Sequence, residues 1–305
     1  MLGIEACDFP TTWNGTYYSS QRGDLIINST VIQNFNTTLT GLLDYTCFMN
    51  SGSLYVIRSE IFLLHNALHR AYFCLEVTEL TSASTMYRHR TSQNVQAYNE
   101  RMKLYPAISS VVLFDICDDT GVTTSWEVLV KQGSESDAAV DCSNTIRGIY
   151  NYTIIDNTGT SCGITNTSLD VCTDTSKPTV NMTLCTSKIA YSAGGLLQCV
   201  YNSDVGSYSY TIVMNLDNST DEMTTYRFTC LVSQVVGEYT YVSQYPQICQ
   251  SSQTPTSVPV GGATLDMLPS EICPSTASLM TSSVVTMATL AVTSAFIVQY
   301  LFCPF

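Results

Sequence analysis

Hydrophobic and polar positions alternate most clearly near the middle of the chain, over residues 142–162. There Tyr150, Tyr152 and Ile154 fall on one face of an extended segment, and the residues between them are polar. The sequence DNTG at residues 156–159 is typical of a tight turn. This stretch therefore predicts a β-hairpin.

Similar units stand before and after this hairpin, each with a cysteine, a glycine, alternating aromatic positions and a returning strand. In the first unit, residues 24–32 are rich in β-branched side chains and predict a strand. In the third, residues 207–214 alternate, and residues 225–232 return. The repeat favours disulfides between the cysteines that open and close each unit, with one further local pair: Cys7 with Cys47, Cys142 with Cys162, Cys199 with Cys230, and Cys172 with Cys185.

Two stretches have helical periodicity. Residues 54–75 predict a strand followed by a helix, which would place His65 and His69 one turn apart. That spacing lets two imidazoles share a metal ion, but Asn66 stands where a metalloprotease helix carries its glutamate, so we favour a solvated helix face. Residues 92–104 fit a second, shorter helix. Further strands are expected over residues 108–117 and 123–130.

These elements predict a mainly β fold. We expect two or three small antiparallel domains braced by disulfides, sandwich-like or barrel-like, with one or two short helices and a C-terminal hydrophobic segment. The expected division is residues 1–6 as a residual N-terminus whose leader is missing, 7–135, 136–195 and 196–250 as cysteine-rich domains, 251–283 as a Ser/Thr/Pro-rich stalk and 284–305 as a hydrophobic tail.

Cysteines and glycosylation sequons place the chain in the secretory pathway. Without a zinc-type spacing, an even set of cysteines favours a disulfide framework. The cysteines expected to pair are Cys7, Cys47, Cys74, Cys117, Cys142, Cys162, Cys172, Cys185, Cys199, Cys230, Cys249 and Cys273. The sequon asparagines, expected to carry N-glycans, are Asn14, Asn28, Asn36, Asn151, Asn166, Asn181 and Asn218.

The C-terminal tail predicts attachment to a membrane. Residues 284–305 carry no charge and are long enough to span a bilayer. Small residues at Ser275, Thr276 and Ala277, a spacer and an apolar end match a glycosylphosphatidylinositol (GPI) attachment signal, with Ser275 as the lipid-bearing residue. A retained single transmembrane span is the alternative. Either places the domains on the extracellular face of the plasma membrane.

Several motifs together resemble a known group of proteins. Residues 7–18 contain an early cysteine followed by W-x-G-x-Y-Y, and residues 72–75 and 94–98 add YFCL and NVQAY. With CSNTIRGIYNYTI and CTDTS within residues 142–176, the chain resembles the tandem cysteine-rich domains of unknown function in invertebrate secreted and membrane proteins. The resemblance implies an extracellular, disulfide-bonded architecture and no catalytic residues.

The candidate chemistry favours binding over catalysis. Arg22, Gly23 and Asp24 form an integrin-type tripeptide in a predicted turn, although such a tripeptide also arises by chance. The net charge of −13 argues against a nucleic-acid partner. No catalytic constellation, metal site or cofactor motif stands out, so we expect a non-catalytic surface glycoprotein that recognises an extracellular protein or glycan. The alternative is a lipocalin-like barrel that binds a small apolar ligand, since W-x-G-x-Y followed by hairpins is similar to the start of such a barrel.

Overall fold

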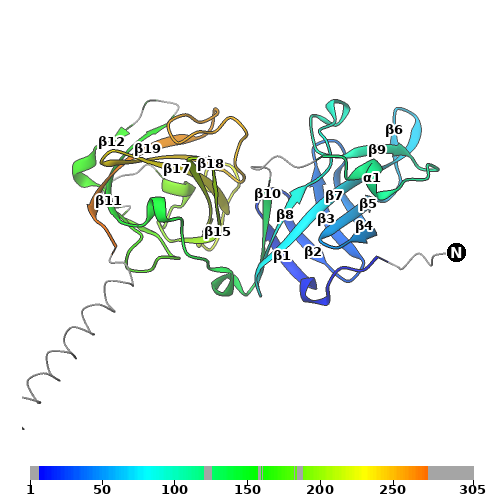
Figure 1. Cartoon of the computed structure of the whole chain (residues 1–305), viewed down its shortest axis with the longest axis horizontal. Helices are drawn as coiled ribbons and strands as arrows, with labels where there is room; N and C mark the ends of the chain where they lie inside the picture. Colours follow the sequence, from blue (N-terminus) through cyan, green and yellow to red (C-terminus); the bar gives the residue numbers. More distant parts are fainter. Residues whose placement is uncertain are drawn as a thin grey trace, which may run out of the picture.

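The computed structural model describes residues 7–119, 126–156, 159, 161–181, 183 and 188–273. The chain is mainly β, as predicted, and its strands form two antiparallel sheets that lie side by side (Figure 1). We call the first sheet the barrel and the second the half-barrel. The described helical segments are short: α1 (Leu113–Ile116) and 3-10 turns such as η1 (Thr11–Trp13) and η2 (Val95–Ala97).

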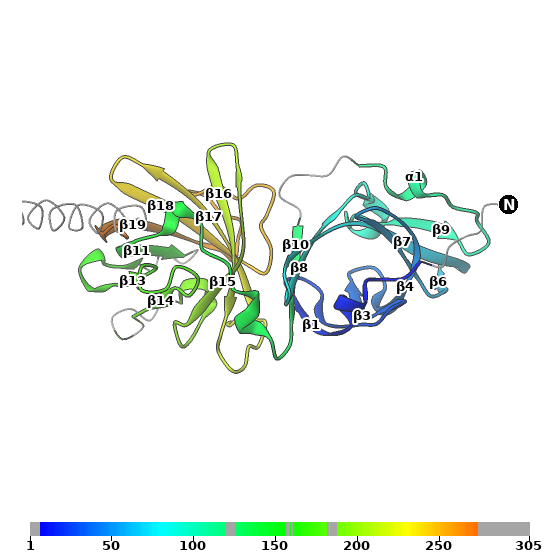
Figure 2. The same ribbon diagram turned by 60° about the horizontal axis from the view of Figure 1, so that its bottom comes forward.

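The barrel is a ring of strands in chain order. Each strand pairs with the next, β5 pairs with β7, and the last strand returns to the first, which closes the ring (Figure 2). This up-and-down closure is the arrangement of lipocalins. Its strands are β1 (Gly15–Ser19), β2 (Gly23–Ile27), β3 (Val31–Thr37), β4 (Gly41–Ser51), β5 (Leu54–Ser59), β7 (Ala67–Thr81), β8 (Ser84–His89) and β10 (Trp126–Lys131).

The barrel interior is packed rather than hollow. Alternate side chains of the strands point inward, and Phe35, Tyr45 and Phe73 meet with ring centroids 5.0 to 5.5 Å apart. At one end η1 places Trp13 against Phe9 and the other buried side chains of this core. Aromatic side chains thus fill this part of the barrel interior.

Both expected long helices are strands and turns. Residues 54–75 form β5, β6 (Phe62–Leu64) and the start of β7. His65 and Asn66 make the two-residue turn between β6 and β7, with positive φ angles of 48° and 61° that suit a tight hairpin. The apolar residues there are so dense that they satisfy both helical and strand periodicities.

The second expected helix and one expected strand are also corrected. Residues 92–104 contain only η2, where the Asn94 side chain accepts a hydrogen bond from the Gln96 backbone, before β9 (Lys103–Pro106) begins. Residues 108–117, expected as a strand, contain α1 instead. The expected strand over residues 123–130 is confirmed by β10 in its described part.

The half-barrel contains both remaining hairpins of the sequence prediction. Its order is β14-β13-β11-β19-β18-β17-β16-β15, with β12 paired to β11. The expected hairpins are present as β11–β12 and β15–β16–β17. Its strands are β11 (Ile149–Asp156), β12 (Ser161–Cys162), β13 (Leu169–Asp170), β14 (Thr179–Val180), β15 (Leu197–Val205), β16 (Tyr208–Asn215), β17 (Phe228–Val236), β18 (Tyr239–Pro246) and β19 (Ala263–Glu271).

One sheet thus unites segments that the sequence prediction separated. β11 comes from the expected central domain, β15 to β18 come from the expected third domain, and β19 comes from the expected stalk. β19 pairs with β11 on one side and β18 on the other, so this part of the stalk is a central strand. The sequence prediction missed this strand because few apolar positions alternate along it. Those positions, Ala263, Leu265 and Met267, are buried.

Closure of the half-barrel is incomplete in the described residues. Its two ends meet over a short stretch, through a bridge between Thr179 and Leu196 and backbone hydrogen bonds that Val180, Leu197 and Cys199 donate to Gly195, Pro178 and Ser176. On one side of β11, β13 and β12 pair with its two ends, so the backbone of Tyr152 between them has no neighbouring strand on this side. The hydroxyl of Thr167 fills the gap, since it accepts from the Tyr152 N–H and donates to its carbonyl oxygen, both at 2.8 Å.

All eleven described cysteines of the expected framework are disulfide-bonded. The predicted pair Cys7–Cys47 is confirmed. The predicted pairs Cys142–Cys162, Cys199–Cys230 and Cys172–Cys185 are wrong. The structure instead has the bonds Cys74–Cys117, Cys142–Cys199, Cys172–Cys273 and Cys230–Cys249. Cys162 is also disulfide-bonded, and Cys185 lies outside the described residues.

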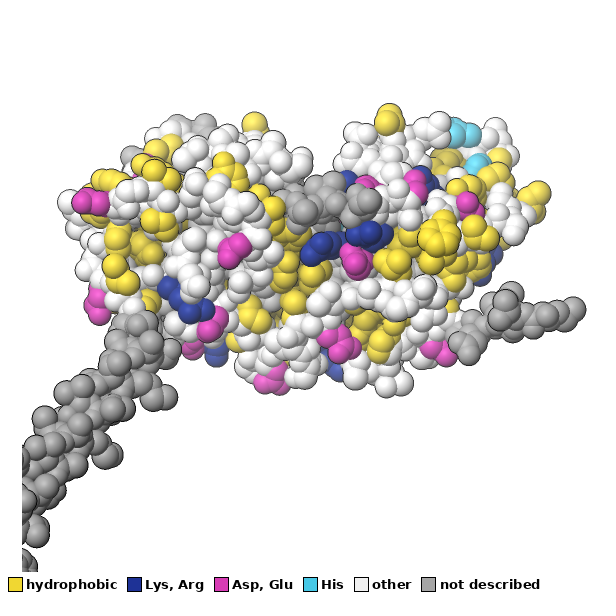
Figure 3. All heavy atoms as spheres, viewed as in Figure 1, with side chains coloured by type: hydrophobic (Ala, Val, Ile, Leu, Met, Phe, Trp, Pro, Cys, Tyr) yellow, Lys and Arg dark blue, Asp and Glu magenta, His cyan; other side chains and the backbone are white. Residues whose placement is uncertain are grey.

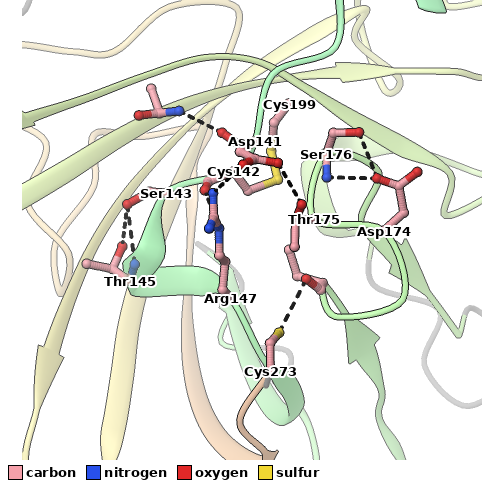
Figure 4. The surroundings of a disulfide bond; sticks show 12 residues. Asp141, Cys142, Ser143, Thr145, Arg147, Asp174, Thr175, Ser176, Cys199 and Cys273 are labelled. Carbon is pink, nitrogen blue, oxygen red and sulfur yellow. Dashed lines mark hydrogen bonds and ion pairs between the residues drawn. A yellow bond between two sulfur atoms is a disulfide. The ribbon is translucent and has the colours of Figure 1, made fainter. Parts of the chain in front are cut away.

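The bond Cys142–Cys199 ties the start of the half-barrel to β15 (Figure 4). Around it, the Arg147 side chain donates to the Cys142 carbonyl oxygen at 2.9 Å and pairs with Asp141 at 3.0 Å. The Thr175 hydroxyl donates to the same Asp141 carboxylate at 2.6 Å. The conspicuous CTDTS sequence thus serves to anchor the half-barrel.

The two sheets share a hydrophobic core. On β10, Trp126 and its alternate neighbours point out of the barrel, and the Trp126 ring lies 5.4 Å from Tyr201 and 5.6 Å from Tyr210. Met86 of β8 and Phe228 of β17 belong to the same buried cluster. Strands β10 and β16 are therefore buried on both faces, because one face lines each sheet's own interior and the other lines the interface.

Residues 274–305, with the expected attachment residue Ser275 and the hydrophobic tail, lie outside the described part of the chain. Within the part described, no helix has both the length and the hydrophobicity needed to cross a bilayer.

Candidate functional site

A pocket of about 330 Å³ lies at one end of the barrel, where the β1–β2 and β3–β4 turns, the end of β8 and the start of β10 come together. Barrel residues Arg22, His89 and Glu127 line it. The half-barrel adds Ile248 and Gln250 from the loop after β18. Cys249, between those two, is bonded to Cys230 of β17, so a disulfide holds this part of the wall in place.

Glu127 is the centre of a buried hydrogen-bond network in this end of the barrel. Its carboxylate accepts from Arg22 Nε at 3.2 Å and Nη2 at 3.0 Å, and from the Tyr87 hydroxyl at 2.6 Å. His89 Nε2 lies 2.7 Å from the same carboxylate. The paired guanidinium and carboxylate offset each other's charge in a region where an isolated ion would be costly.

The local sequence turns Arg22 into the barrel. The Ser19 hydroxyl accepts from the Arg22 backbone N–H at 3.0 Å, which shapes the β1–β2 turn. Gly23 follows with φ of 80°, a conformation that glycine adopts without strain. The guanidinium then lies over the rings of Phe35 and Phe73, 4.9 and 5.8 Å from their centroids.

This placement corrects the integrin-type reading of Arg22, Gly23 and Asp24. Arg22 is buried, with 6% of its surface exposed, and its side chain is committed to Glu127 and to the carbonyl oxygen of Asn36. A partner that recognises the tripeptide needs a free, projecting arginine. Only Gly23 and Asp24 are exposed there.

Electrostatics follow from the burial of the network. Burial alone would raise the pKa of Glu127, but the charge of Arg22 and the hydrogen bonds with His89 and Tyr87 outweigh it and lower the pKa to about 2. Burial and the negative charge of Glu127 raise the pKa of Tyr87 well above its ordinary value. Glu127 is therefore ionised and Tyr87 neutral at any physiological pH.

Two buried polar atoms beside the pocket have no hydrogen-bond partner among the described residues: Glu100 Oε2 and His89 Nδ1. Both residues line the pocket. Glu100 Oε1, in contrast, accepts from the Thr38 backbone N–H at 2.8 Å and from its hydroxyl at 3.0 Å. Of the seven buried side-chain atoms without a partner in the described part of the chain, these two belong to the wall of one pocket, which indicates a place for a ligand group.

A second pocket, of about 360 Å³, lies between the sheets near Tyr18 and Arg227. Arg227 lies over the Tyr18 ring at 5.0 Å and donates to the carbonyl oxygens of Asn215 and Asp217. Its principal polar group is thus already bonded within the protein. This pocket shows less sign of a missing partner than the barrel mouth.

His65 and His69, weighed as a metal pair and set aside in favour of a solvated helix face, do not lie on a helix. His65 is in the β6–β7 turn, and His69 is in β7, where its ring nitrogen Nδ1 lies 3.0 Å from the Ala67 carbonyl oxygen. Within the described ranges, no three His, Cys, Asp or Glu side chains come together as a metal site.

The sequon asparagines stand at accessible places where they are described. Asn14, Asn28 and Asn36 are exposed on the barrel, as are Asn181 and Asn218 on the half-barrel. Asn151 on β11 is half-buried, and the side chain of Asn166 lies outside the described set. Glycosylation of these residues stays a prediction.

Sequence reasoning missed most of the pocket. Arg22 was noted for another reason, and His89, Glu100 and Glu127 were not selected. Glu127 had a usable signal, because a carboxylate within the apolar run WEVLV needs a buried cation. The identity of that cation was not readable, since Arg22 lies 105 residues away.

Comparison with known proteins gives one match. Residues 139–263, less than half of the chain, match the model of a domain of unknown function, DUF7042. That segment covers most of the half-barrel, and the match supports an uncharacterised family without extending to the tandem invertebrate arrangement. No curated protein and no solved structure matches the chain.

Proposed function

We propose that this chain is a non-catalytic extracellular binding protein whose ligand site is the pocket at the mouth of the barrel. The observation that carries the proposal is the pair of buried, unpartnered atoms, Glu100 Oε2 and His89 Nδ1, on residues that line a pocket of about 330 Å³. A volume near 300 Å³ suits a small molecule. Closed up-and-down barrels commonly hold ligands at or below such a mouth.

The disulfides indicate a secreted or extracellular protein, since such bonds persist in oxidising compartments. Attachment of the chain to the plasma membrane, through a GPI anchor at Ser275 or a retained span, is part of the proposal. Release of the protein from intact cells by a phosphatidylinositol-specific phospholipase tests the lipid anchor, and retention of the protein on the cells contradicts it.

The polar character of the pocket changes the expected ligand. The small-ligand alternative drawn from the sequence was an apolar molecule, but aromatic rings and the ionised pair of Arg22 and Glu127 occupy this part of the barrel interior. An apolar molecule at the mouth would leave the carboxylate and imidazole unsatisfied. The ligand proposed is therefore polar.

The first test is a screen for binding with a blocked pocket as comparison. The glycosylated, disulfide-bonded protein is produced through the secretory pathway, and a library of small polar metabolites is screened by native mass spectrometry. Gln93 is exposed and lines the pocket, whereas Gln96 is exposed outside it. We expect bound compounds to be lost in Gln93→Trp and kept in Gln96→Trp. A library without any binder contradicts the proposed function.

Recognition of an extracellular protein is the second candidate function. The end of the molecule around β6, β9 and α1 exposes Leu63, Leu68, Ile108 and Phe114, at 58 to 97% of their surfaces. Hydrophobic side chains gather over α1 and its neighbouring strands in Figure 3. Such clusters are typical of protein-binding surfaces.

If this surface binds a protein, substitutions at this end of the molecule alone should reduce the binding. Binding of the labelled ectodomain to cells should fall in Phe114→Ser and be unchanged in Met223→Ser, an equally exposed apolar residue on the half-barrel. Equal binding by both variants contradicts a protein-binding role for this surface.

A further inference from the structure

We infer that the pocket at the mouth of the barrel takes a small organic cation, such as an amine, with Glu100 as its counter-ion. The inference rests on the proposed function and names the ligand class of the same site. It follows from the balance of charges around the pocket.

The deep charges of the pocket cancel. Arg22 and Glu127 form a two-point contact, at 3.2 and 3.0 Å, so neither calls for a charge from outside. At the rim, Arg101 is paired with the carboxylate of Asp119. The remaining charged side chain in the pocket wall is Glu100, whose nearest cation is Arg22 at a longer 3.5 Å.

Glu100 also has the vacant acceptor. Oε1 is occupied by Thr38, while Oε2 is buried without a partner among the described residues. The Glu100 carboxylate is therefore complementary to a group that donates hydrogen bonds and carries positive charge.

The surroundings also favour a cation. Tyr98 lines the pocket and is 67% exposed, so its ring is free to lie against a cation. Over longer distances, the net charge of −13 draws cations towards the molecule. An anionic ligand would meet the Glu100 carboxylate without a free arginine to offset it.

Three compounds with the same phenol ring test the inference: tyramine with an ammonium group, tyrosol with a hydroxyl and 3-(4-hydroxyphenyl)propionate with a carboxylate. Their binding to the intact ectodomain is measured by titration calorimetry. Tyramine should bind at least ~10-fold more tightly than tyrosol, since a charge-assisted hydrogen bond adds about 1.5 kcal/mol or more. The propionate should bind most weakly.

Variants locate the effect on the proposed counter-ion. Glu100→Gln should remove the preference for tyramine over tyrosol, whereas Glu76→Gln, which removes a carboxylate outside the pocket, should keep it. Tyr98→Leu should weaken tyramine more than tyrosol. Because Glu100 also contacts Thr38, circular dichroism and the urea midpoint are measured for each variant, and Tyr98→Leu serves if Glu100→Gln fails to fold.

The outcomes separate the two proposals. Equal or tighter binding of tyrosol or the propionate overturns the cation inference and supports a ligand in the pocket. No binding of any of the three, with pocket-dependent binders found in the metabolite library, also overturns the inference alone. An empty library overturns the proposed function together with this inference.

Discussion

The barrel and the half-barrel close their sheets by different means. In the barrel, β10 pairs with β1 and β5 with β7, so the hydrogen-bond ladder runs round the whole ring. In the half-barrel a short backbone pairing, with the Thr179–Leu196 bridge and hydrogen bonds from Val180, Leu197 and Cys199, joins the segment of β14 to that of β15. Disulfides such as Cys142–Cys199 and Cys172–Cys273 connect the segments between the strands. Covalent bonds thus reinforce in one sheet a closure that a long ladder provides in the other.

Their interiors differ as well. Tyrosines and cysteines aside, the described part of the chain has three buried ionisable residues: Arg22, His89 and Glu127. All three are in the barrel. The buried polar side chains of the half-barrel, such as Gln198, Asn215 and Gln244, are uncharged. A continuous ladder tolerates a costly polar centre, and a polar centre is what a binding site requires.

The largest effect is expected in the half-barrel, where a disulfide reinforces the closure of the sheet. The loop that Cys142–Cys199 closes spans 57 residues, so its removal by Cys142→Ala/Cys199→Ala should lower the free energy of unfolding by about 4 kcal/mol. Hydrogen exchange should show that the amides of β15 lose protection while those of β3 and β4 keep it. The matched control, Cys7→Ala/Cys47→Ala, should leave the protection of β3 and β4 largely intact because the ladder holds them. Equal loss of amide protection in both sheets would contradict the difference between the barrel and the half-barrel.

A slightly smaller loss is expected from the polar centre of the barrel. Glu127→Gln removes the partner of a buried guanidinium and should lower the free energy of unfolding by about 3 kcal/mol. Glu76→Gln breaks the half-exposed pair with Arg90 and should cost less than about 1 kcal/mol. Urea unfolding measures both, and similar values for the two would show that burial of the pair has no consequence.

The same carboxylate should make stability depend on pH. The pKa of Glu127 falls from the ordinary 4.5 to about 2 on folding, so its contribution is complete above pH 4.5 and is lost as the pH falls towards 2. The urea midpoint of the native chain should therefore drop between pH 5 and pH 3 by more than that of Glu127→Gln. Parallel curves for the two proteins would exclude this role of Glu127.

The smallest effect concerns the gap beside β11. Thr167→Val keeps the shape of the side chain but leaves the N–H and carbonyl groups of Tyr152 unpaired, so we expect a loss of about 1 to 2 kcal/mol. Thr173→Val changes an exposed threonine of the same region and should be neutral within about 0.5 kcal/mol. Thermal unfolding is sufficient to compare the two variants, and equal melting temperatures would show that the Thr167 hydroxyl is dispensable.

Local patterns predicted the strands wherever one face of a strand differed from the other. The hairpins at β11–β12 and β15–β17 were recognised because their apolar positions alternate. The region of His65 and Asn66 was misjudged because β7 is buried on both faces along part of its length, which removes the alternation. Its signal was the asparagine in a two-residue turn, where a positive φ is tolerated.

Long-range pairing was harder to predict. The spacing of cysteines suggested local bonds, but Cys172 pairs with Cys273 across 101 residues because β13 and β19 both neighbour β11. The charged pocket was hidden for the same reason: Arg22, His89 and Glu127 come from three strands or turns that meet only when the ring closes. Neither can be derived without the topology.

The packing of Trp126 against Tyr201 and Tyr210 also supplies the molecule with an internal optical reporter. The chain has two tryptophans, and the other, Trp13, belongs to the separate core inside the barrel. With Trp13 replaced by phenylalanine, the emission of the single remaining indole would shift to longer wavelength when the sheets separate. Fluorescence could then follow the parting of the two halves independently of the unfolding of either.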